Sequence, residues 1–293
     1  MYVHKIERKY IMYQQKIGMS LEKNYPVSKT EVIKMLKNIG FDAISLAWEA
    51  DPELGKLIEQ AKEDGLIIQS LHAPQWKVAS MWSFDEKQSR PVKEELLQAL
   101  ADCQKFEVPI LVVHAWLGFD YHFDANNLNF TNFDELVACA EECGVQIAFE
   151  NAEGNEYLFA LMERYENHPT VGICWDSGHE MCYNAPDLLA KYGNRLIMTH
   201  LNDNLGVRSY EGILTGDDDL HLLPYDGIAD WDYNIERLGK SQPVEILNFE
   251  LKIASKKNRH ENDIYSQMGL EVYFTEAYKR ACKIAHRYLR TKV

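Results

Sequence analysis

The sequence of 293 residues lacks several features that mark other classes of protein. No apolar stretch in it approaches the roughly 20 residues that a membrane-spanning helix needs. The N-terminal segment MYVHKIERKYIMYQQ mixes charged and apolar residues, so we expect no signal peptide. None of the six cysteines forms a C-x-x-C pair, and a chain of this size does not depend on disulfides. We therefore expect reduced thiols and a cytoplasmic protein.

Positive charge is also in short supply, because the formal net charge is −14. Proteins that bind nucleic acid usually carry a basic surface, since Lys and Arg replace the counterions on the phosphates. We therefore expect no nucleic-acid partner. Low-complexity segments and Pro/Gly/Ser-rich linkers are missing as well. We expect a single domain over residues 1–293, with its core at about 16–289.

What the sequence does contain is a regular alternation of short apolar runs and helical stretches. The runs predicted as strands are 16–21, 41–48, 66–74, 109–116, 145–151, 171–178, 196–203 and 244–251. The helices predicted between and after them are 28–40, 53–64, one that starts near Arg90, 132–143, 155–166 and 264–289. Ser28 and Glu31 have the spacing of a capping box, and Gly40 is placed to end the first helix.

Eight apolar strands with helices between them favour parallel pairing through right-handed crossovers. Eight is also the number of strands that closes a (β/α)8 TIM barrel, the fold that we predict. An open doubly wound sheet is the alternative. The first run is not followed by the Gly-rich turn that binds phosphate in that fold.

Polar residues gather where the predicted strands end, which is where (β/α)8 barrels carry their chemistry. These residues are His72, His114, Glu150, Asp176 with His179 just beyond, His200, Asp203 and Glu250. Each has an ordinary structural explanation when taken singly; Asp203, for example, fits a helix cap. The joint pattern is different, because six consecutive strands bring such groups to one rim. Converging carboxylates repel one another and lose hydration, so the pattern indicates either a bound cation or protonated carboxyl groups.

The predicted metal ligands are Glu150, Asp176, His200 and Glu250. A set of carboxylate oxygens and one imidazole nitrogen suits Mn²⁺, which we expect first, or Mg²⁺, Co²⁺ or Zn²⁺. Cysteine is absent from the set, which argues against a structural zinc site. We expect one divalent ion per chain.

The order of the motifs resembles a known family. SLHAP, VVHAW, FENAEGNE, CWDSGHE, THLND, DLHLLPYDGIADW and FEL follow one another along the chain. In this order they resemble the xylose-isomerase-like barrels, which include sugar-phosphate isomerases and epimerases, ketose 3-epimerases and type-IV apurinic endonucleases. The resemblance to ketose epimerases implies one ion on the four ligands above and substrate contacts from His179 and Glu156. Those epimerases have an arginine soon after the matching histidine, whereas this chain has Gly206 there and Arg208 as the nearest candidate.

The endonuclease branch of the same family is the main alternative. Its ligand pattern would map onto His72, His114, Glu150, Asp176, His179, His200, Asp219, His221 and Glu250, and all these positions are filled. Asp219 and His221 are thus possible additional metal or substrate residues. The segments HAWLGF and FEL stand where the endonucleases have His-Pro-Gly and Glu-Thr-Pro, and the net charge is negative. A basic stretch after the last strand (Lys252, Lys256, Lys257, Arg259) could contact a phosphate or form a solvated loop.

The function that we predict is isomerisation or epimerisation of a sugar or sugar phosphate. A bound ion would polarise the substrate carbonyl and stabilise an enediolate, while a carboxylate removes the neighbouring proton. Glu150 and Glu250 are the expected bases. Two bases on opposite faces of the sugar would give epimerisation, and a single base would give isomerisation. Two alternative hypotheses remain. One is a hydrolase or lyase that uses the same site, and the other is a barrel that only binds its ligand.

The remaining predicted contacts concern the carbohydrate. His72, His114 and His179 would hold hydroxyl groups, and Trp116 and Trp48 could either stack on a sugar face or pack the rim. Trp175 alternates with Asp176, so we expect it to face the helices. The loop WKVASMWSF (76–84) is either a lid or a packed surface loop. A small carbohydrate is the expected partner, and a homo-oligomer is compatible with the sequence.

Overall fold

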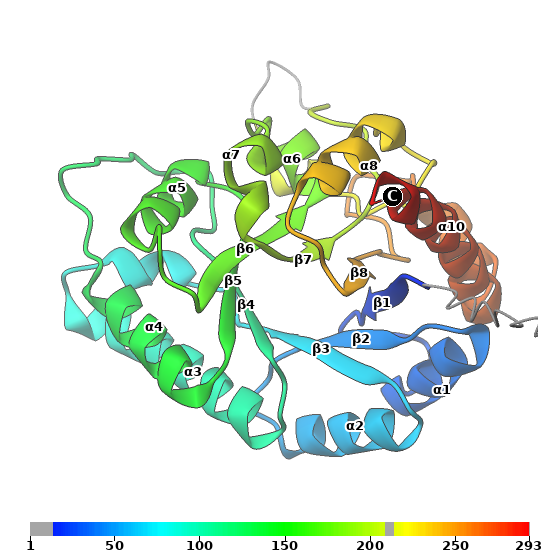
Figure 1. Ribbon diagram of the computed structural model, residues 1–293, viewed down its shortest axis with the longest axis horizontal. Coiled ribbons are helices and arrows are strands. Elements are labelled where there is room, and N and C mark those ends of the chain that lie inside the picture. Colours follow the sequence, from blue (N-terminus) through cyan, green and yellow to red (C-terminus); the bar gives the residue numbers. More distant parts are fainter. Residues whose placement is uncertain (1–13, 209–213, 293) are drawn as a thin grey trace, which may run out of the picture.

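The computed structural model describes residues 14–208 and 214–292 of the chain, so most of the segment examined for a signal peptide lies outside the described residues. Eight parallel strands form one sheet in the order β7-β6-β5-β4-β3-β2-β1-β8, ringed by helices (Figure 1). The strands are β1 Lys16–Ser20, β2 Ala43–Ala47, β3 Ile67–His72, β4 Ile110–His114, β5 Gln146–Glu150, β6 Val171–Asp176, β7 Leu196–His200 and β8 Ile246–Phe249. The predicted (β/α)8 barrel is confirmed.

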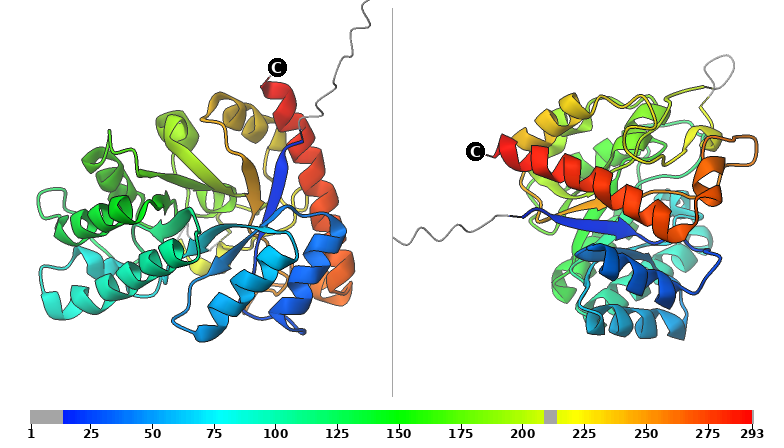
Figure 2. Two further views of the ribbon diagram at one scale, coloured as in Figure 1. Left: turned by 60° about the horizontal axis from the view of Figure 1, so that its bottom comes forward. Right: turned by 90° about the vertical axis from the view of Figure 1, so that its right-hand side faces the viewer.

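The helices lie outside the strands, and the views in Figure 2 show α10 running along the side of the barrel next to β1. They are α1 Lys29–Ile39, α2 Pro52–Glu63, α3 Glu86–Lys105, α4 Thr131–Cys143, α5 Asn155–Arg164, α6 Ser177–Cys182, α7 Leu188–Tyr192, α8 Trp231–Lys240, α9 Asp263–Gln267 and α10 Leu270–Thr291. Over the described ranges, no helix is both long and apolar enough to cross a membrane.

The ends of the helices follow local capping, which corrects two of the predicted boundaries. The capping box of Ser28 and Glu31 is present, and Gly40 ends α1. Helix α3 begins before Arg90, because the Asp85 side chain accepts a hydrogen bond from the Lys87 amide and caps the helix there. The single helix predicted over 264–289 is in fact α9 and α10. Gly269 separates them with a φ of 77°, which interrupts a helix.

The barrel closes between β7 and β8, which are joined by individual contacts rather than by a regular ladder. The Thr199 hydroxyl donates to the Asn248 carbonyl at 3.2 Å and accepts from the Asn248 amide at 3.1 Å. The Leu201 amide also donates to the Asn248 carbonyl, at 2.9 Å. Elsewhere the pairing is regular except for register shifts at Ile44/Ser45 and at Ile173/Cys174. The Thr199 side chain therefore supplies two of the hydrogen bonds that join β7 to β8.

Strand alternation places the polar strand ends inside the barrel. Ile110, Val112, Ala148, Cys174 and Met198 form a separate buried apolar cluster on β4 to β7. Side-chain contacts of 2.8–3.4 Å link four polar residues of the remaining strands β1, β2, β3 and β8, namely Ser20, Ser45, Ser70 and Asn248. Side chains two residues apart on a strand share a face. The residues two positions after Val112, Ala148, Cys174 and Met198 are His114, Glu150, Asp176 and His200, so all four continue this interior column.

Candidate metal centre

Glu150, at the end of β5, lies at the centre of the polar rim. Its Oε2 accepts hydrogen bonds from Nε2 of His72 and Nε2 of His114, both at 3.1 Å. Its Oε1 is 2.7 Å from Nδ1 of His200. Burial raises the pKa of the Glu150 carboxyl, but the imidazoles of His200 and His114 outweigh burial and hold the pKa well below its usual range. Glu150 is therefore an ionised carboxylate in a fully buried position.

His200 joins this carboxylate to a second one. Its Nδ1 lies 3.0 Å from Oε2 of Glu250, just beyond β8. Burial lowers the pKa of His200, but the neighbouring carboxylates of Glu150 and Glu250 outweigh burial and hold the pKa well above its usual range. Burial likewise raises the pKa of Glu250, and the neighbouring His200 and His221 bring it below its usual value. These directions favour a protonated imidazole at His200, between two carboxylates.

Asp176 completes the set of four predicted ligands. Its two carboxylate oxygens accept from Nδ2 of Asn202 at 3.1 and 2.9 Å, and one of them also accepts from the His179 amide at 2.7 Å. Burial raises the pKa of this carboxyl. One donor atom from each of Glu150, Asp176, His200 and Glu250 lies within 4.8 Å of the others. Three carboxylates and one imidazole at this spacing fit a divalent ion with a preference for oxygen and nitrogen ligands.

Two further groups flank these four residues and share members with them. His72, His114 and Glu150 form one group, and Asp176, His179 and His221 form the other. A third combination includes Cys174, but burial raises the pKa of its thiol to about 12, so the thiol stays protonated and is a poor ligand. The described residues thus offer three adjoining donor groups at one rim.

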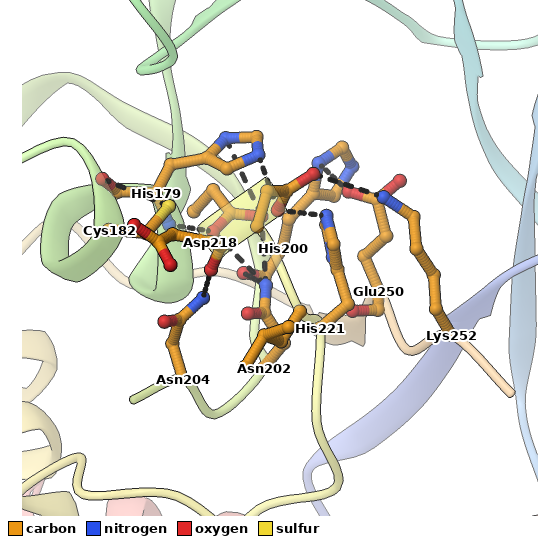
Figure 3. A network of polar contacts seen from close by, with 12 residues as sticks. His179, Cys182, His200, Asn202, Asn204, Asp218, His221, Glu250 and Lys252 are labelled. Carbon is orange, nitrogen blue, oxygen red and sulfur yellow. Dashed lines mark hydrogen bonds and ion pairs between the residues drawn. The ribbon is translucent and has the colours of Figure 1, made fainter. Parts of the chain in front are cut away.

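Asp219 stands beside the second flanking group. Figure 3 shows His179, His221, Glu250 and Lys252 in one network of polar contacts. Nε2 of His221 is 2.7 Å and Nε2 of His179 is 3.3 Å from Oδ1 of Asp219. The other ring nitrogens bond to backbone carbonyls, that of His179 to Asn151 at 2.8 Å and that of His221 to Glu250 at 3.0 Å. These backbone contacts fix the orientation of both rings.

Several predicted contact residues lie apart from this cluster. Glu156 is exposed and accepts a hydrogen bond from the Tyr121 hydroxyl at 2.8 Å. Arg208 is exposed, and its guanidinium donates to the Leu205 carbonyl at 3.2 Å. Trp116 stacks on Tyr157, with ring centroids 4.2 Å apart, and both line a pocket of about 370 Å³. The structure brings together the histidines and acids of the strand ends but not these three side chains.

The other tryptophans pack outside the centre. Nε1 of Trp48 donates to Asp102 on α3 at 2.8 Å, so this residue packs the rim rather than facing the site. Trp175 faces the helices as expected and bonds to Glu180 at 2.9 Å. In the 76–84 loop, Trp82 is buried and donates to the Ala115 carbonyl at 2.8 Å. Residues 78–82 are therefore a packed segment, whereas Trp76 is 74% exposed.

Sequence reasoning missed the asparagines that support the acids. The Asn151 side chain pairs with both the amide and the carbonyl of Asp176, at 2.8 and 2.9 Å. Asn202 holds the carboxylate of Asp176, as described above. Asn151 directly follows Glu150 in FEN, and Asn202 follows His200 by two residues in HLND. Their position close to predicted ligands could have indicated this supporting role. Ligand-holding residues of this kind fix the orientation of the groups that they contact.

Asp203 requires a correction, because it does not cap a helix. Its carboxylate accepts from the amides of Asn204, Tyr225 and Ala229 and from Nε1 of Trp231, at 2.8–3.0 Å. The Asp203 backbone also pairs with that of Leu222. Asp203 therefore anchors the segment 219–231, which carries Asp219 and His221. A helix cap was predicted because sequence alone does not show which distant amides a buried carboxylate will meet.

Fold and site together define a class of protein, the (β/α)8 barrels with histidines and acids that could hold a metal ion at the carboxyl ends of their strands. The sequence model of the xylose isomerase-like TIM barrel family matches residues 33–268, and the chain belongs to this family.

The proteins similar to the chain include an uncharacterized protein, the IolI protein and an L-ribulose 3-epimerase. The uncharacterized protein y4fM of Sinorhizobium fredii is 36% identical over 156 residues, and the match spans 48% of this chain and 47% of y4fM. The structure of the IolI protein with a bound zinc atom has a TM-score of 0.72 and 20% identity, covering 93% of this chain and 99% of IolI. An L-ribulose 3-epimerase structure has a TM-score of 0.69 and 14% identity, with coverage of 94% and 96%. At these identities the two structures show a shared fold.

Proposed function

We propose that the protein is a divalent-metal-dependent isomerase or epimerase of a sugar or sugar phosphate, in which a carboxylate removes the proton next to a carbonyl. The observation that carries this proposal is the pair of carboxylates on one imidazole, with Glu150 and Glu250 at 2.7 and 3.0 Å from the same nitrogen of His200. Both are held ionised, as a general base must be. The similarity of fold to an L-ribulose 3-epimerase supports the same reaction class.

The two glutamates differ in access, and this suggests a division of labour. The Glu250 side chain is 24% exposed, whereas that of Glu150 is completely enclosed. Glu250 can therefore reach a substrate that enters from solvent, and it takes the proton. Glu150 accepts from three imidazoles. To return a proton to the opposite face, as an epimerisation requires, it would first have to take one from a neighbouring imidazole such as His72, whose Nε2 lies 3.1 Å from its Oε2. His72, which is partly exposed, and His114 are placed to orient substrate hydroxyls.

The ion belongs at Glu150, Asp176, His200 and Glu250, where the donor atoms fit. When bound, it supplies a Lewis acid that polarises the substrate carbonyl and stabilises the enediolate. We propose Mn²⁺, because three carboxylates and one imidazole form a mostly oxygen site. The zinc in the IolI structure makes Zn²⁺ the next candidate.

Proton exchange with solvent tests this proposal. The metal-loaded protein is incubated in D₂O with a panel of ketoses, aldoses and their phosphates, and deuterium is located by NMR. We expect deuterium at the carbon next to the carbonyl of at least one sugar, abolished by chelation and restored by Mn²⁺. Absence of exchange across the panel, with metal bound, would contradict the proposal.

A second candidate function has its own support. The three adjoining donor groups that share Glu150 and Asp176 resemble a site for several ions, which a metal-dependent phosphodiesterase would use. This candidate predicts three ions per chain and cleavage of DNA at abasic sites. The formal net charge of −14 weighs against a nucleic-acid substrate.

A further inference from the structure

The cluster around Asp219 contains two lysines as well as two histidines. While Oδ1 of Asp219 faces His221 and His179, its Oδ2 lies 3.3 Å from Nζ of Lys252 and 3.1 Å from Nζ of Lys256. The Asp219 side chain is only 10% exposed. Oδ2 of this nearly buried carboxylate is therefore hydrogen-bonded to two ammonium groups, whereas Oδ1 lies close to two imidazoles without forming a hydrogen bond.

The lysines are held in place by the backbone that carries them. The Lys252 amide donates to the His221 carbonyl at 3.0 Å, and the Lys252 carbonyl accepts from Nδ2 of Asn262 at 2.7 Å. Lys252 follows Glu250 by two residues, and Figure 3 shows it extending beside Glu250 toward the cluster. The same strand end thus delivers both a carboxylate and an ammonium group to this rim.

The other basic residues of this stretch point elsewhere. Arg259 pairs with the buried carboxylate of Asp218 and with Glu261. Lys257 is exposed and makes no ion pair within the part of the chain that the structure describes. Two of the four basic residues, and only these two, contact Asp219 in the described ranges. A solvated basic loop would give no reason for this convergence.

We propose that the ammonium groups of Lys252 and Lys256 take the cation position beside Asp219, so that the protein binds one divalent ion at Glu150, Asp176, His200 and Glu250 and excludes a further ion from the His179–Asp219–His221 side. A divalent ion there would lie next to two positive charges in a poorly solvated place, and like charges repel strongly under such conditions. Asp176, His179 and His221 offer donor atoms for a further ion. The carboxylate of Asp219 beside them, however, is bound by Lys252 and Lys256.

The lysine pair also has donors to spare. An ammonium group has three N–H donors, and each lysine uses one on Asp219, so further donors remain for an oxygen of the substrate. Each lysine side chain is about 30% exposed, so these donors are within reach of solvent and ligand. If the proposed sugar reaction holds, on which this step rests, the pair would bind a substrate oxygen next to Asp219.

Metal stoichiometry tests the proposal without relying on activity. Metal-free protein is titrated with Mn²⁺ and with Zn²⁺ by calorimetry, and bound metal is measured by atomic emission after gel filtration. We expect one ion per chain in the natural protein and in the control Lys257→Met. The double variant Lys252→Met/Lys256→Met should bind a second, weaker ion, which His221→Gln in the same background removes.

Three results would overturn the proposal. They are two or more ions in the natural protein, one ion only in a folded double variant, and a second ion that survives His221→Gln. Circular dichroism and the retained first ion establish that the double variant is folded. The deuterium-exchange experiment fails independently of this titration, so an inactive protein that binds one ion would reject the sugar reaction and leave the lysine pair in place.

Discussion

At the scale of single residues, the centre depends on Glu250 as the accessible carboxylate. Glu250→Gln keeps the size of the side chain and removes its charge, so we expect the proton-exchange rate to fall by about 10²–10⁴-fold, the usual contribution of a general base. The variant should also bind the ion more weakly, because it loses an anionic ligand. Exchange is measured by NMR at saturating metal.

Glu245→Gln is the matched control for this substitution. Glu245 lies at the other end of β8, is 74% exposed and pairs with Lys16 at the surface. Its variant should retain full exchange and full metal affinity. Full activity with normal metal content in Glu250→Gln would refute the assignment of Glu250 as a base.

The charge state of His200 gives a prediction on pH. The folded pKa of His200 in the metal-free protein lies above the unfolded value, so its bound proton stabilises the fold below about pH 6.5, and this stabilisation is lost as the pH rises through the folded pKa. At pH 7 an incoming ion must displace this proton. Metal affinity should therefore rise between pH 6 and 8, with about one proton released per ion.

Calorimetry in buffers of different ionisation enthalpy measures the protons released. His122→Gln, which changes an exposed histidine, should leave the proton count unchanged. A metal affinity that is constant over this pH range would show that His200 is neutral before the ion binds.

For single residues, the sequence predicted the location of side chains that project from strands. It did not predict the location of side chains that are held by tertiary contacts. His114, Glu150, Asp176 and His200 follow apolar strands at a fixed period, so their common rim could be derived from alternation. Glu156 and Arg208 lie on a helix start and a loop, where no such period fixes a direction. Resemblance alone suggested their contacts with substrate, and the structure places them outside the cluster.

At the scale of elements, the segment 219–231 is held by one carboxylate. Asp203→Asn replaces an acceptor oxygen by an amide group that faces N–H donors, so some buried donors lose their partner. We expect the free energy of unfolding to fall by about 2–4 kcal/mol, since each unpaired buried group costs about 1–3 kcal/mol. Urea denaturation measures the change.

Asp217→Asn, at an exposed position in the preceding turn, should leave stability within about 0.5 kcal/mol of the natural protein. Equal denaturation midpoints for the two variants would show that Asp203 does not anchor the segment. His221 and Tyr225 have φ angles of 48° and 75°, an unfavourable conformation that such an anchor offsets.

The boundaries of elements were predictable where capping was local. The capping box of α1 involves residues within one four-residue segment, so it can be recognised in the sequence. The division between α9 and α10 depends on a single glycine inside an otherwise helical pattern, which is harder to recognise. The loop at 76–84 could not be assigned from sequence, because its packing depends on Trp82 reaching the carbonyl of Ala115 on the next strand connection.

At the scale of the whole molecule, bound metal should stabilise the barrel. Its four predicted ligands come from β5, β6, β7 and the end of β8, so an ion would tie together the strands on both sides of the β7–β8 seam. At a free ion concentration 100 times the dissociation constant, the free energy of unfolding should rise by about 2.7 kcal/mol. This corresponds to roughly 5 °C in Tm.

Differential scanning calorimetry with and without Mn²⁺ measures this shift. Asp176→Asn should reduce it strongly, since an oxygen that Asn202 positions loses its charge. A metal-bound protein with an unchanged Tm would indicate that the ion binds the unfolded chain equally well.

The two-residue period of the strands has a consequence for how this sequence can change during evolution. A deletion of one residue within β5 would turn Glu150 to the outside of the barrel and bring its neighbour inside. The strand register around β6 already contains a shift at Ile173/Cys174, just before Asp176. Length changes in lineages that keep this centre should therefore fall in loops and helices, while the strands accept substitutions but not insertions or deletions of single residues.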